Sequence, residues 1–491
     1  FIVEALDWLV IGVFFLALIG IIVWVVRQKQ NDSADYFLGG RDATWLAIGA
    51  SIFASNIGSE HLIGLAGAGA SSGMAMAHWE IQGWMILILG WVFVPFYTRS
   101  MVYTMPEFLE RRYNPQSRTI LSVISLVSYV LTKVAVTVYA GGLVFQQVFG
   151  IKELWGIDFF WIAAIGLVVL TALYTIFGGM KSVLYTSVLQ TPILLLGSLI
   201  ILILGFKELG GWDEMMRVCG AVTVNDYGDT MTNLIRSNDD ANFPWLGALI
   251  GSAIIGFWYW CTDQFIVQRV LSGKNEMEAR RGTIFGAYLK LLPVFLFLIP
   301  GMIAFALHQK YIGAGGEGFL PMLENGTANA DAAFPTLVAK LLPAGVKGLV
   351  VCGILAALMS SLASLFNSSA MLFTIDFYKR FRPQTSEKKL VGIGQVATVV
   401  IVILGILWIP IMRSVGDVLY TYLQDVQSVL APGIAAAFLL GICWKRTSAQ
   451  GGMWGLISGM VIGLTRLGAK VYYSNAGEVA DSTFKYLFYD M

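Results

Sequence analysis

Apolar residues fill most of this chain in runs of about 20, separated by shorter polar segments. A bilayer core about 30 Å thick requires roughly 20 apolar residues in each crossing helix, so each run predicts one membrane-spanning helix. The pattern predicts twelve such spans. They cover residues 5–26, 44–67, 78–98, 119–148, 155–177, 181–205, 245–267, 281–308, 344–372, 390–411, 416–441 and 452–470.

The composition agrees with this pattern. Hydrophobic residues make up 57% of the 491 positions, charged residues make up 13%, and the mean hydropathy is +0.72. A chain this apolar is typical of an all-α polytopic membrane protein embedded in a lipid bilayer, in one membrane domain spanning 1–491. The net charge of +1 argues against a nucleic-acid partner, and the four cysteines lack the spacing of a zinc site.

The distribution of basic residues predicts the orientation. If loops alternate sides from an outside N-terminus, nineteen Lys and Arg residues fall inside and ten fall outside, as the positive-inside rule requires. No basic segment precedes the first apolar run, so we interpret residues 5–26 as a retained span and not as a cleaved signal. We therefore expect a multi-pass protein of a plasma membrane or a bacterial inner membrane with its N-terminus outside.

The order of spans predicts an internal repeat. After an extra N-terminal helix at 5–26, ten spans divide into two groups of five, at 44–205 and 245–441. An odd number of helices per group places the second group upside down relative to the first, which is a five-plus-five inverted repeat. Residues 452–491 form an additional C-terminal helical region, which we expect to be cut short because residues 484–489 resemble the start of another span.

The first helix of each group contains an interruption of glycine and polar residues, at 49–59 and 251–263. Paired interruptions of this kind predict discontinuous helices and a binding site near the middle of the membrane. In the first interruption, carbonyls near Ala54 and Ile57 lose their intrahelical donors, and a later span offers the hydroxyls of Ser360 and Ser361. Such an all-oxygen set without a carboxylate suits a monovalent hard cation. The same small residues fit close helix packing equally well, so the pattern alone leaves both interpretations open.

Ionisable residues within the predicted spans form a separate group. Glu80 and Lys290 each cost at least about 2.5–3.5 kcal/mol in a membrane unless they are paired or hydrated. An ion pair that holds two helices together and a pair that contacts a solute account for them equally well. For Lys133 and Asp263 we expect a role in a gate or scaffold ion pair and no contact with solute.

Eight ordered motifs resemble the sodium/solute symporter family, most closely its sodium/glucose cotransporter branch. They are distributed along most of the chain: DYFLGGR at 35–41, FASNIGS at 53–59, YTMPEFL at 103–109, WYWCTDQ at 258–264, VQR at 267–269, YLKLLP at 288–293, LMSSLAS at 358–364 and FLLGICWKR at 438–446. The resemblance implies a LeuT-type fold and sodium-coupled symport of a neutral, glucose- or galactose-like sugar by alternating access.

The resemblance also implies two sets of site residues. The co-transported sodium ion is expected on the carbonyls of Ala54, Ile57 and Ala357 and the hydroxyls of Ser360 and Ser361. The sugar is expected to contact Asn56, His61, Glu80, Tyr259, Trp260, Lys290 and Gln424. Ser187 stands where many members of the sugar branch have Asp, which leaves open whether one or two sodium ions move in each cycle.

Other functions fit the sequence less well. A symporter of myo-inositol or another small solute is the nearest alternative, and a sodium-dependent sugar sensor or channel is an alternative of a different class. An anionic solute would need a cationic pocket, whereas Glu80 and Lys290 balance each other. The chain carries no nucleophile elbow, metal cluster or phosphate loop, so we do not expect an enzyme.

Overall fold

The computed structural model describes residues 3–58, 60–240, 243–323, 326–415 and 419–476. Its α-helices are α1 (Ala5–Val26), α2 (Ser33–Leu38), α3 (Trp45–Asn56), α4 (Ala66–Ser71), α5 (Ala77–Ile81), α6 (Met85–Ile88), α7 (Val94–Ser100), α8 (Met105–Arg112), α9 (Pro115–Ser128), α10 (Ala135–Phe149), α11 (Phe159–Leu209), α12 (Trp212–Gly220), α13 (Trp245–Gly256), α14 (Gln264–Leu271), α15 (Glu276–Leu289), α16 (Ile299–Gly313), α17 (Ala333–Leu341), α18 (Val346–Met371), α19 (Lys379–Phe381), α20 (Glu387–Val415), α21 (Leu419–Cys443) and α22 (Ala449–Ala476). Strands β1 (Glu153–Leu154) and β2 (Ile157–Asp158) form a short antiparallel hairpin.

In the part of the chain that the structure describes, six π-helical turns interrupt or extend these helices, and several of them carry side chains of the site described below. They are η2 (Glu60–Leu65), η5 (Leu89–Phe93), η6 (Tyr129–Val134), η7 (Phe257–Thr262), η8 (Val294–Leu298) and η10 (Leu372–Tyr378). Such turns change the direction in which a helix presents its side chains and are frequent at functional sites.

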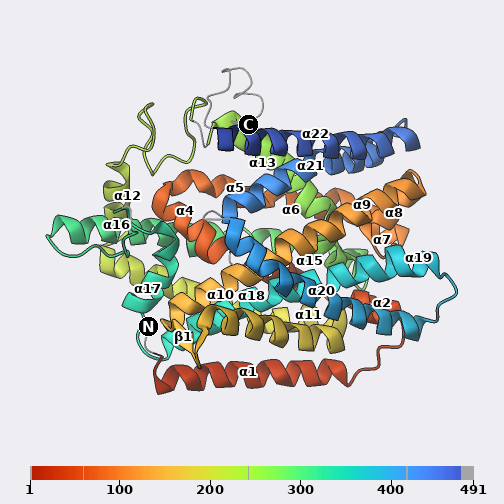
Figure 1. Cartoon of the computed structure of the whole chain (residues 1–491), viewed down its shortest axis with the longest axis horizontal. Coiled ribbons are helices and arrows are strands. Elements are labelled where there is room, and N and C mark those ends of the chain that lie inside the picture. The colour runs from red at the N-terminus through yellow and green to blue at the C-terminus, as the bar shows by residue number, and fades with distance from the viewer. Residues whose placement is uncertain (1–2, 59, 241–242, 324–325, 416–418, 477–491) are drawn as a thin grey trace.

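Long helices run roughly along one direction through the molecule (Figure 1). The red helix α1 and the blue helix α22 lie on opposite edges of this bundle, while α12 and α16 lie at one end and α8 and α19 lie at the other. The helices α11 and α18 pack along each other, and α3 packs against α11, α15 and α18. The α18 residues from the middle of the helix to its end are almost all buried, so α18 is the central helix of the bundle.

Helix occupies most of the described part of each of the twelve predicted spans. Among the described residues, eight helices are long and apolar enough to cross a membrane by themselves. The spans predicted at 155–177 and 181–205 are joined in α11, and the hairpin β1–β2 occupies the residues just before Phe159. The run 484–489 lies outside the described residues.

A glycine bends α11 between the two predicted spans. Gly179 has φ 57° and ψ −149°, a backbone conformation that L side chains rarely adopt. A Cβ at this position would lie 2.4 Å from the carbonyl oxygen of Tyr36, so the close approach of α2 also requires glycine. The Tyr36 hydroxyl donates to the Ile176 carbonyl at 2.9 Å, which fastens α2 to the bend.

The extra helix α1 is tied to the central helix through a buried carboxylate. Asp7 Oδ1 accepts hydrogen bonds of 2.7 Å from the backbone N–H groups of Gly345 and Gly348, where α18 begins. These N–H groups have no partner within the helix, and the helix dipole favours a negative charge at that end. A Cβ at Gly348 would lie 2.7 Å from the Asp7 backbone, so glycine permits the contact.

Both predicted discontinuities are present. The α3 helix ends at Asn56, Ile57 is extended with φ −81° and ψ 107°, and helix resumes at Glu60. In the second group, Asp263 is extended with φ −75° and ψ 129° between η7 and α14. The Asp263 carboxylate accepts a hydrogen bond from the Phe265 N–H at 3.3 Å and so caps the start of α14. The exact repeat boundaries at 44–205 and 245–441 stay a prediction.

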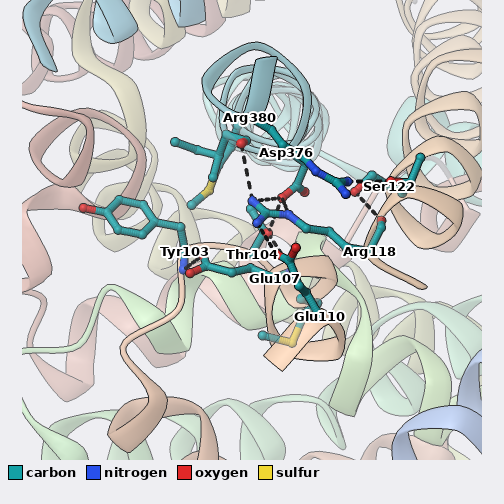
Figure 2. A network of polar contacts seen from close by, with 12 residues as sticks. Tyr103, Thr104, Glu107, Glu110, Arg118, Ser122, Asp376 and Arg380 are labelled. Atoms are coloured by element: carbon teal, nitrogen blue, oxygen red, sulfur yellow. Dashed lines mark hydrogen bonds and ion pairs between the residues drawn. The ribbon is translucent and has the colours of Figure 1, made fainter. Parts of the chain in front are cut away.

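A polar network joins α8, α9 and η10, which continues from the end of α18 (Figure 2). Arg118 lies between two carboxylates, with Nη1 2.5 Å from Glu110 Oε2 and Nη2 2.8 Å from Asp376 Oδ1. Thr104 also donates to Asp376 Oδ1 at 2.9 Å and caps α8 by accepting from the Glu107 N–H. The Asp376 side chain is fully buried, so Arg118 supplies the positive charge that makes this burial possible.

Replacing Arg118 by methionine should therefore destabilise the fold. Arg118→Met leaves the buried Asp376 without its cation, for which the expected cost is about 3 kcal/mol. We expect a clear decrease in the melting temperature of the purified protein, measured by thermal unfolding in detergent. Arg380→Met is the matched control, because Arg380 is exposed and its hydrogen bonds to described residues go to Thr119 and the Pro115 carbonyl and not to a carboxylate. Equal melting temperatures for the two variants would show that Arg118 is not needed to balance Asp376.

Candidate solute and cation site

A cavity of about 80 Å³ lies between the two discontinuous helices. This is room for several water molecules, since about 10–15 Å³ of such space holds one. Its lining comes from seven parts of the chain: Ser55, Asn56, Glu60, His61, Leu65, Trp79, Glu80, Gln82, Lys133, Thr137, Ile255, Tyr259, Trp260, Phe265, Lys290, Ser361, Leu365 and Gln427. Six of the seven predicted solute residues are therefore gathered around one space.

A three-residue charged cluster forms one wall of the cavity. Glu80 Oε2 lies 2.6 Å from Lys290 Nζ, and Glu80 Oε1 lies 3.1 Å from His61 Nε2. The Lys290 Nζ to His61 Nε2 distance is 2.9 Å, so all three groups are in mutual contact. Each of the three side chains is buried, and inside a membrane their charges must therefore be balanced by one another.

Local structure explains how these three groups meet. Glu80 lies on α5, His61 lies on η2 just after the helix break, and Lys290 follows the last residue of α15. A Cβ at Gly83 would lie 2.6 Å from Lys290 Cγ, so the absence of a side chain on the turn after α5 leaves room for the lysine stem. The contact predicted between Glu80 and Lys290 is thus present, and His61 joins it as a third member.

Aromatic side chains and an amide form the facing wall. Tyr259 and Trp260 lie on η7, with ring centroids 4.9 Å apart and planes 89° apart, an edge-to-face pair. Asn56 Nδ2 donates to the Tyr259 hydroxyl at 3.0 Å, which connects the last residue of α3 with η7. In the described part of the chain, Asn56 Oδ1, His61 Nδ1 and Gln82 Oε1 are buried without a hydrogen-bond partner. Such atoms need partners, and a polar occupant of the cavity would provide them.

A second ion pair lies beside Tyr259. Lys133 Nζ contacts Asp263 Oδ2 at 2.5 Å and lies 4.8 Å from the Tyr259 ring centroid. The Tyr129 hydroxyl donates to the other carboxylate oxygen, Asp263 Oδ1. The ion pair predicted for both residues is present, and it joins η6 to the second helix break. Lys133 also lines the cavity, which the expectation of a purely structural role did not include.

Serine hydroxyls connect α18 with the first helix break. Ser361 Oγ donates to the Ser55 carbonyl at 2.7 Å and lies 3.3 Å from the Ile57 carbonyl oxygen. Ser55 Oγ in turn lies 3.4 Å from Ser360 Oγ and 2.8 Å from Ser364 Oγ. These distances place oxygen atoms of α3 and α18 around one small region, as the predicted cation site requires.

Two further predicted cation ligands, Ala54 and Ala357, belong to the same two helices. Ala54 and Ala357 are fully buried on α3 and α18, and Ala357 precedes Ser361 by one helical turn. Among the described residues, no backbone N–H across the break bonds to the Ala54 carbonyl, whereas the Phe53 carbonyl accepts from the Ile57 N–H. Ser187 Oγ lies 3.4 Å from Ser360 Oγ, so Ser187 places a neutral hydroxyl beside a predicted cation ligand.

Gln424 on α21 is the predicted solute residue whose side chain the described residues do not include. Gln427, one turn further along the same helix, lines the cavity. Sequence reasoning also missed Glu60, Gln82 and Gln427 as cavity residues. For Glu60 a signal existed, because it is an acidic residue between Asn56 and His61 in a predicted span.

Comparisons with known proteins agree with this architecture. The profile described as "Sodium:solute symporter family" matches residues 36–459. Human sodium/myo-inositol cotransporter 2 is 38% identical over 478 residues, which cover 94% of this chain and 70% of the relative. Sodium/glucose cotransporter 4 of Danio rerio is 38% identical over 484 residues, covering 95% of this chain and 72% of the relative.

A solved structure of a Na⁺-coupled sialic acid symporter, in a substrate-bound outward-open state, superposes with a TM-score of 0.77. The match covers 94% of this chain and 96% of that one at 22% identity, so it shows the shared fold. The all-α, five-plus-five inverted repeat of LeuT type is therefore confirmed. The protein is a multi-pass membrane symporter that couples a small solute to sodium, and it is not an enzyme. The chain belongs to the sodium:solute symporter family.

Proposed function

We propose that this symporter carries a neutral, polyhydroxylated solute, with a glucose- or galactose-like sugar as the first candidate. The observation that carries this proposal is the cavity wall formed by Glu80, Lys290 and His61. The carboxylate and the ammonium group compensate each other, so this wall offers no surplus positive charge to an anionic solute. It does offer hydrogen-bond donors and acceptors of both kinds, which is what several hydroxyl groups require.

The facing wall supports the same class of solute. A sugar has apolar ring faces as well as hydroxyl groups, and Tyr259 and Trp260 provide aromatic surface beside the Asn56 amide. We propose that six of the residues that line the cavity contact the solute: Asn56, His61, Glu80, Tyr259, Trp260 and Lys290. Gln424 remains a proposed contact from the resemblance, with Gln427 beside the cavity on the same helix.

Myo-inositol is the second candidate. It is also neutral and polyhydroxylated, and the human relative at 38% identity is named as a sodium/myo-inositol cotransporter. The Danio rerio relative with the same identity is named for glucose, so similarity does not favour one solute over the other. The cavity chemistry fits both solutes.

We further propose that sodium binds between α3 and α18. Its ligands would be the carbonyls of Ala54, Ile57 and Ala357 and the hydroxyls of Ser360 and Ser361. The 3.3 Å distance between Ser361 Oγ and the Ile57 carbonyl oxygen supports this assignment, because it brings together one proposed ligand from α18 and one from the helix break. The oxygen-only donor set suits a hard monovalent cation.

Binding at this position can drive transport. Sodium bridges a broken helix and the central helix α18, so it binds more tightly to the conformation in which these helices lie close together. Only such a difference in sodium affinity between two conformations shifts the equilibrium between them. A membrane potential of 100 mV contributes about 2.3 kcal/mol per charge. A tenfold sodium gradient adds about 1.4 kcal/mol. The potential and the gradient together support roughly 500-fold solute accumulation at one sodium per solute.

We propose that the N-terminus lies outside, in a plasma membrane or a bacterial inner membrane. The segments rich in Lys and Arg adjoin α8 and α19, which lie at one end of the bundle, whereas α12 and α16 lie at the other end (Figure 1). The positive-inside rule places the first end in the cytoplasm.

Uptake into proteoliposomes tests the proposed function. Labelled glucose, galactose, myo-inositol and proline would be offered with inward gradients of sodium, lithium or protons. We expect sodium-dependent accumulation of a sugar or of myo-inositol above its outside concentration. Uptake of proline without uptake of any polyol would contradict the solute class, and sodium-dependent binding without accumulation would identify a sensor or channel.

A further inference from the structure

Glu60 is a carboxylate in the cavity that the assigned sites do not use. It is the first residue of η2, directly after the helix break, and it is partly buried. It lines the same cavity as Ser361 on the cation side and Glu80 on the solute side. Among the described residues, its carboxylate has no hydrogen bond and no ion pair at contact distance, although His61, Lys133 and Lys290 are near enough to attract it electrostatically.

The basic residues nearby are already engaged with other groups. Lys290 contacts Glu80 at 2.6 Å and His61 at 2.9 Å. Lys133 contacts Asp263 at 2.5 Å. Arg269 donates through Nε to Ser51 Oγ at 3.0 Å and also donates to the Phe265 carbonyl. In the described part of the chain these cations attract Glu60 only from a distance, so a polar occupant of the cavity would supply the direct partner that a carboxylate at membrane depth needs.

The position of Glu60 relative to the cation region makes sodium one such partner. A Cβ on Gly58 would lie 3.3 Å from Ser361 Oγ and 3.6 Å from Glu60 Oε2. The two oxygen atoms therefore face the same glycine and are no more than about 7 Å apart. At such a separation, in a protein interior, a carboxylate attracts a cation strongly even without direct coordination. The proposed sodium ligands are all neutral carbonyls and hydroxyls, so Glu60 would add the negative charge that they lack.

We propose that Glu60 couples sodium binding to solute binding. Its charge attracts sodium to the site between Ile57 and Ser361, and its carboxylate oxygens accept hydrogen bonds from solute hydroxyl groups on the other side. Hydrogen bonds to an ionised acceptor are shorter and stronger than hydrogen bonds between neutral groups. The carboxylate that attracts the cation therefore also increases the affinity for the solute. By thermodynamic linkage, sodium then raises solute affinity and solute raises sodium affinity by the same factor. This inference rests on the proposed function for its solute class.

Neutralising the carboxylate tests the proposal. Glu60→Gln keeps the size of the side chain and removes its charge. We expect the sodium concentration for half-maximal uptake to rise about tenfold, and the solute concentration for half-maximal uptake to rise as well. We also expect the solute half-saturation constant, measured at low and high sodium, to depend on sodium much less than in the original protein. Glu153→Gln is the matched control, because Glu153 is an exposed glutamate on β1 and should leave all three values unchanged.

A measurement without solute keeps the test independent of the proposed function. Sodium should raise the melting temperature of the purified original protein relative to choline, and Glu60→Gln should lose most of this increase. Glu60→Asp, which keeps the charge, should retain at least half of it. An unchanged sodium effect in Glu60→Gln overturns the proposal, as does a variant in which only solute affinity falls. Failure of the original protein to take up any polyol would instead contradict the proposed function, while the melting measurement would still report on Glu60.

Discussion

Lys290→Met is expected to reduce sodium-driven solute uptake at least a hundredfold. The substitution removes the ammonium group that lies 2.6 Å from Glu80 and 2.9 Å from His61. The Glu80 side chain is only 7% exposed, so its charge would remain buried with the His61 imidazole as its close partner among the described residues. Removing one partner of a buried ion pair costs about 3–5 kcal/mol, and a loss of about 3 kcal/mol already exceeds a hundredfold change in an equilibrium constant. Uptake by proteoliposomes and thermal unfolding of the purified variant provide the measurements.

Two further variants separate folding from solute contact. Lys152→Met removes an exposed lysine just before β1 and should behave like the original protein. The double variant Glu80→Gln with Lys290→Met removes both charges, so we expect it to recover most of the melting temperature and little of the uptake. If the double variant transports normally, the pair serves to hold the helices together and has no role in solute recognition.

Ser361→Ala is expected to raise the sodium concentration for half-maximal uptake about tenfold. The hydroxyl lies 2.7 Å from the Ser55 carbonyl and 3.3 Å from the Ile57 carbonyl, in the region assigned to sodium. Loss of one oxygen ligand from such a set should cost about 1.4 kcal/mol, the equivalent of a tenfold change. Uptake measured against sodium concentration, at saturating solute, checks this value.

The control for this variant is Ser458→Ala on α22. Among the described residues, the Ser458 hydroxyl bonds within its own helix, at the Gly455 carbonyl, so its loss should leave the sodium dependence unchanged. A Ser361→Ala protein with the same sodium dependence as the control would exclude Ser361 from the ligands. It would then favour the interpretation of the serines as residues that permit close helix packing.

The sequence by itself determined the spans and the two places where helices break. Apolar runs of about 20 residues locate a crossing helix without knowledge of any neighbour, because the bilayer sets the required length. The breaks near Ile57 and at Asp263 were also readable locally, because glycine and polar residues interrupt runs that are otherwise apolar. The bend at Gly179 was not predicted as such, but it falls between two predicted spans.

Only the tertiary structure decided which polar groups are partners. Glu80, Lys290 and His61 belong to three different elements, and their contact depends on how each helix is rotated and on the space left by Gly83. The sequence allowed the pair Glu80–Lys290 but could not exclude separate partners, because hydropathy patterns carry no information on helix rotation against a neighbour. Among the described residues, the absence of a cation in direct contact with Glu60 depends on the same arrangement. A carboxylate is recognisable in any sequence, but which cations contact it becomes visible only when each nearby cation has been placed in space.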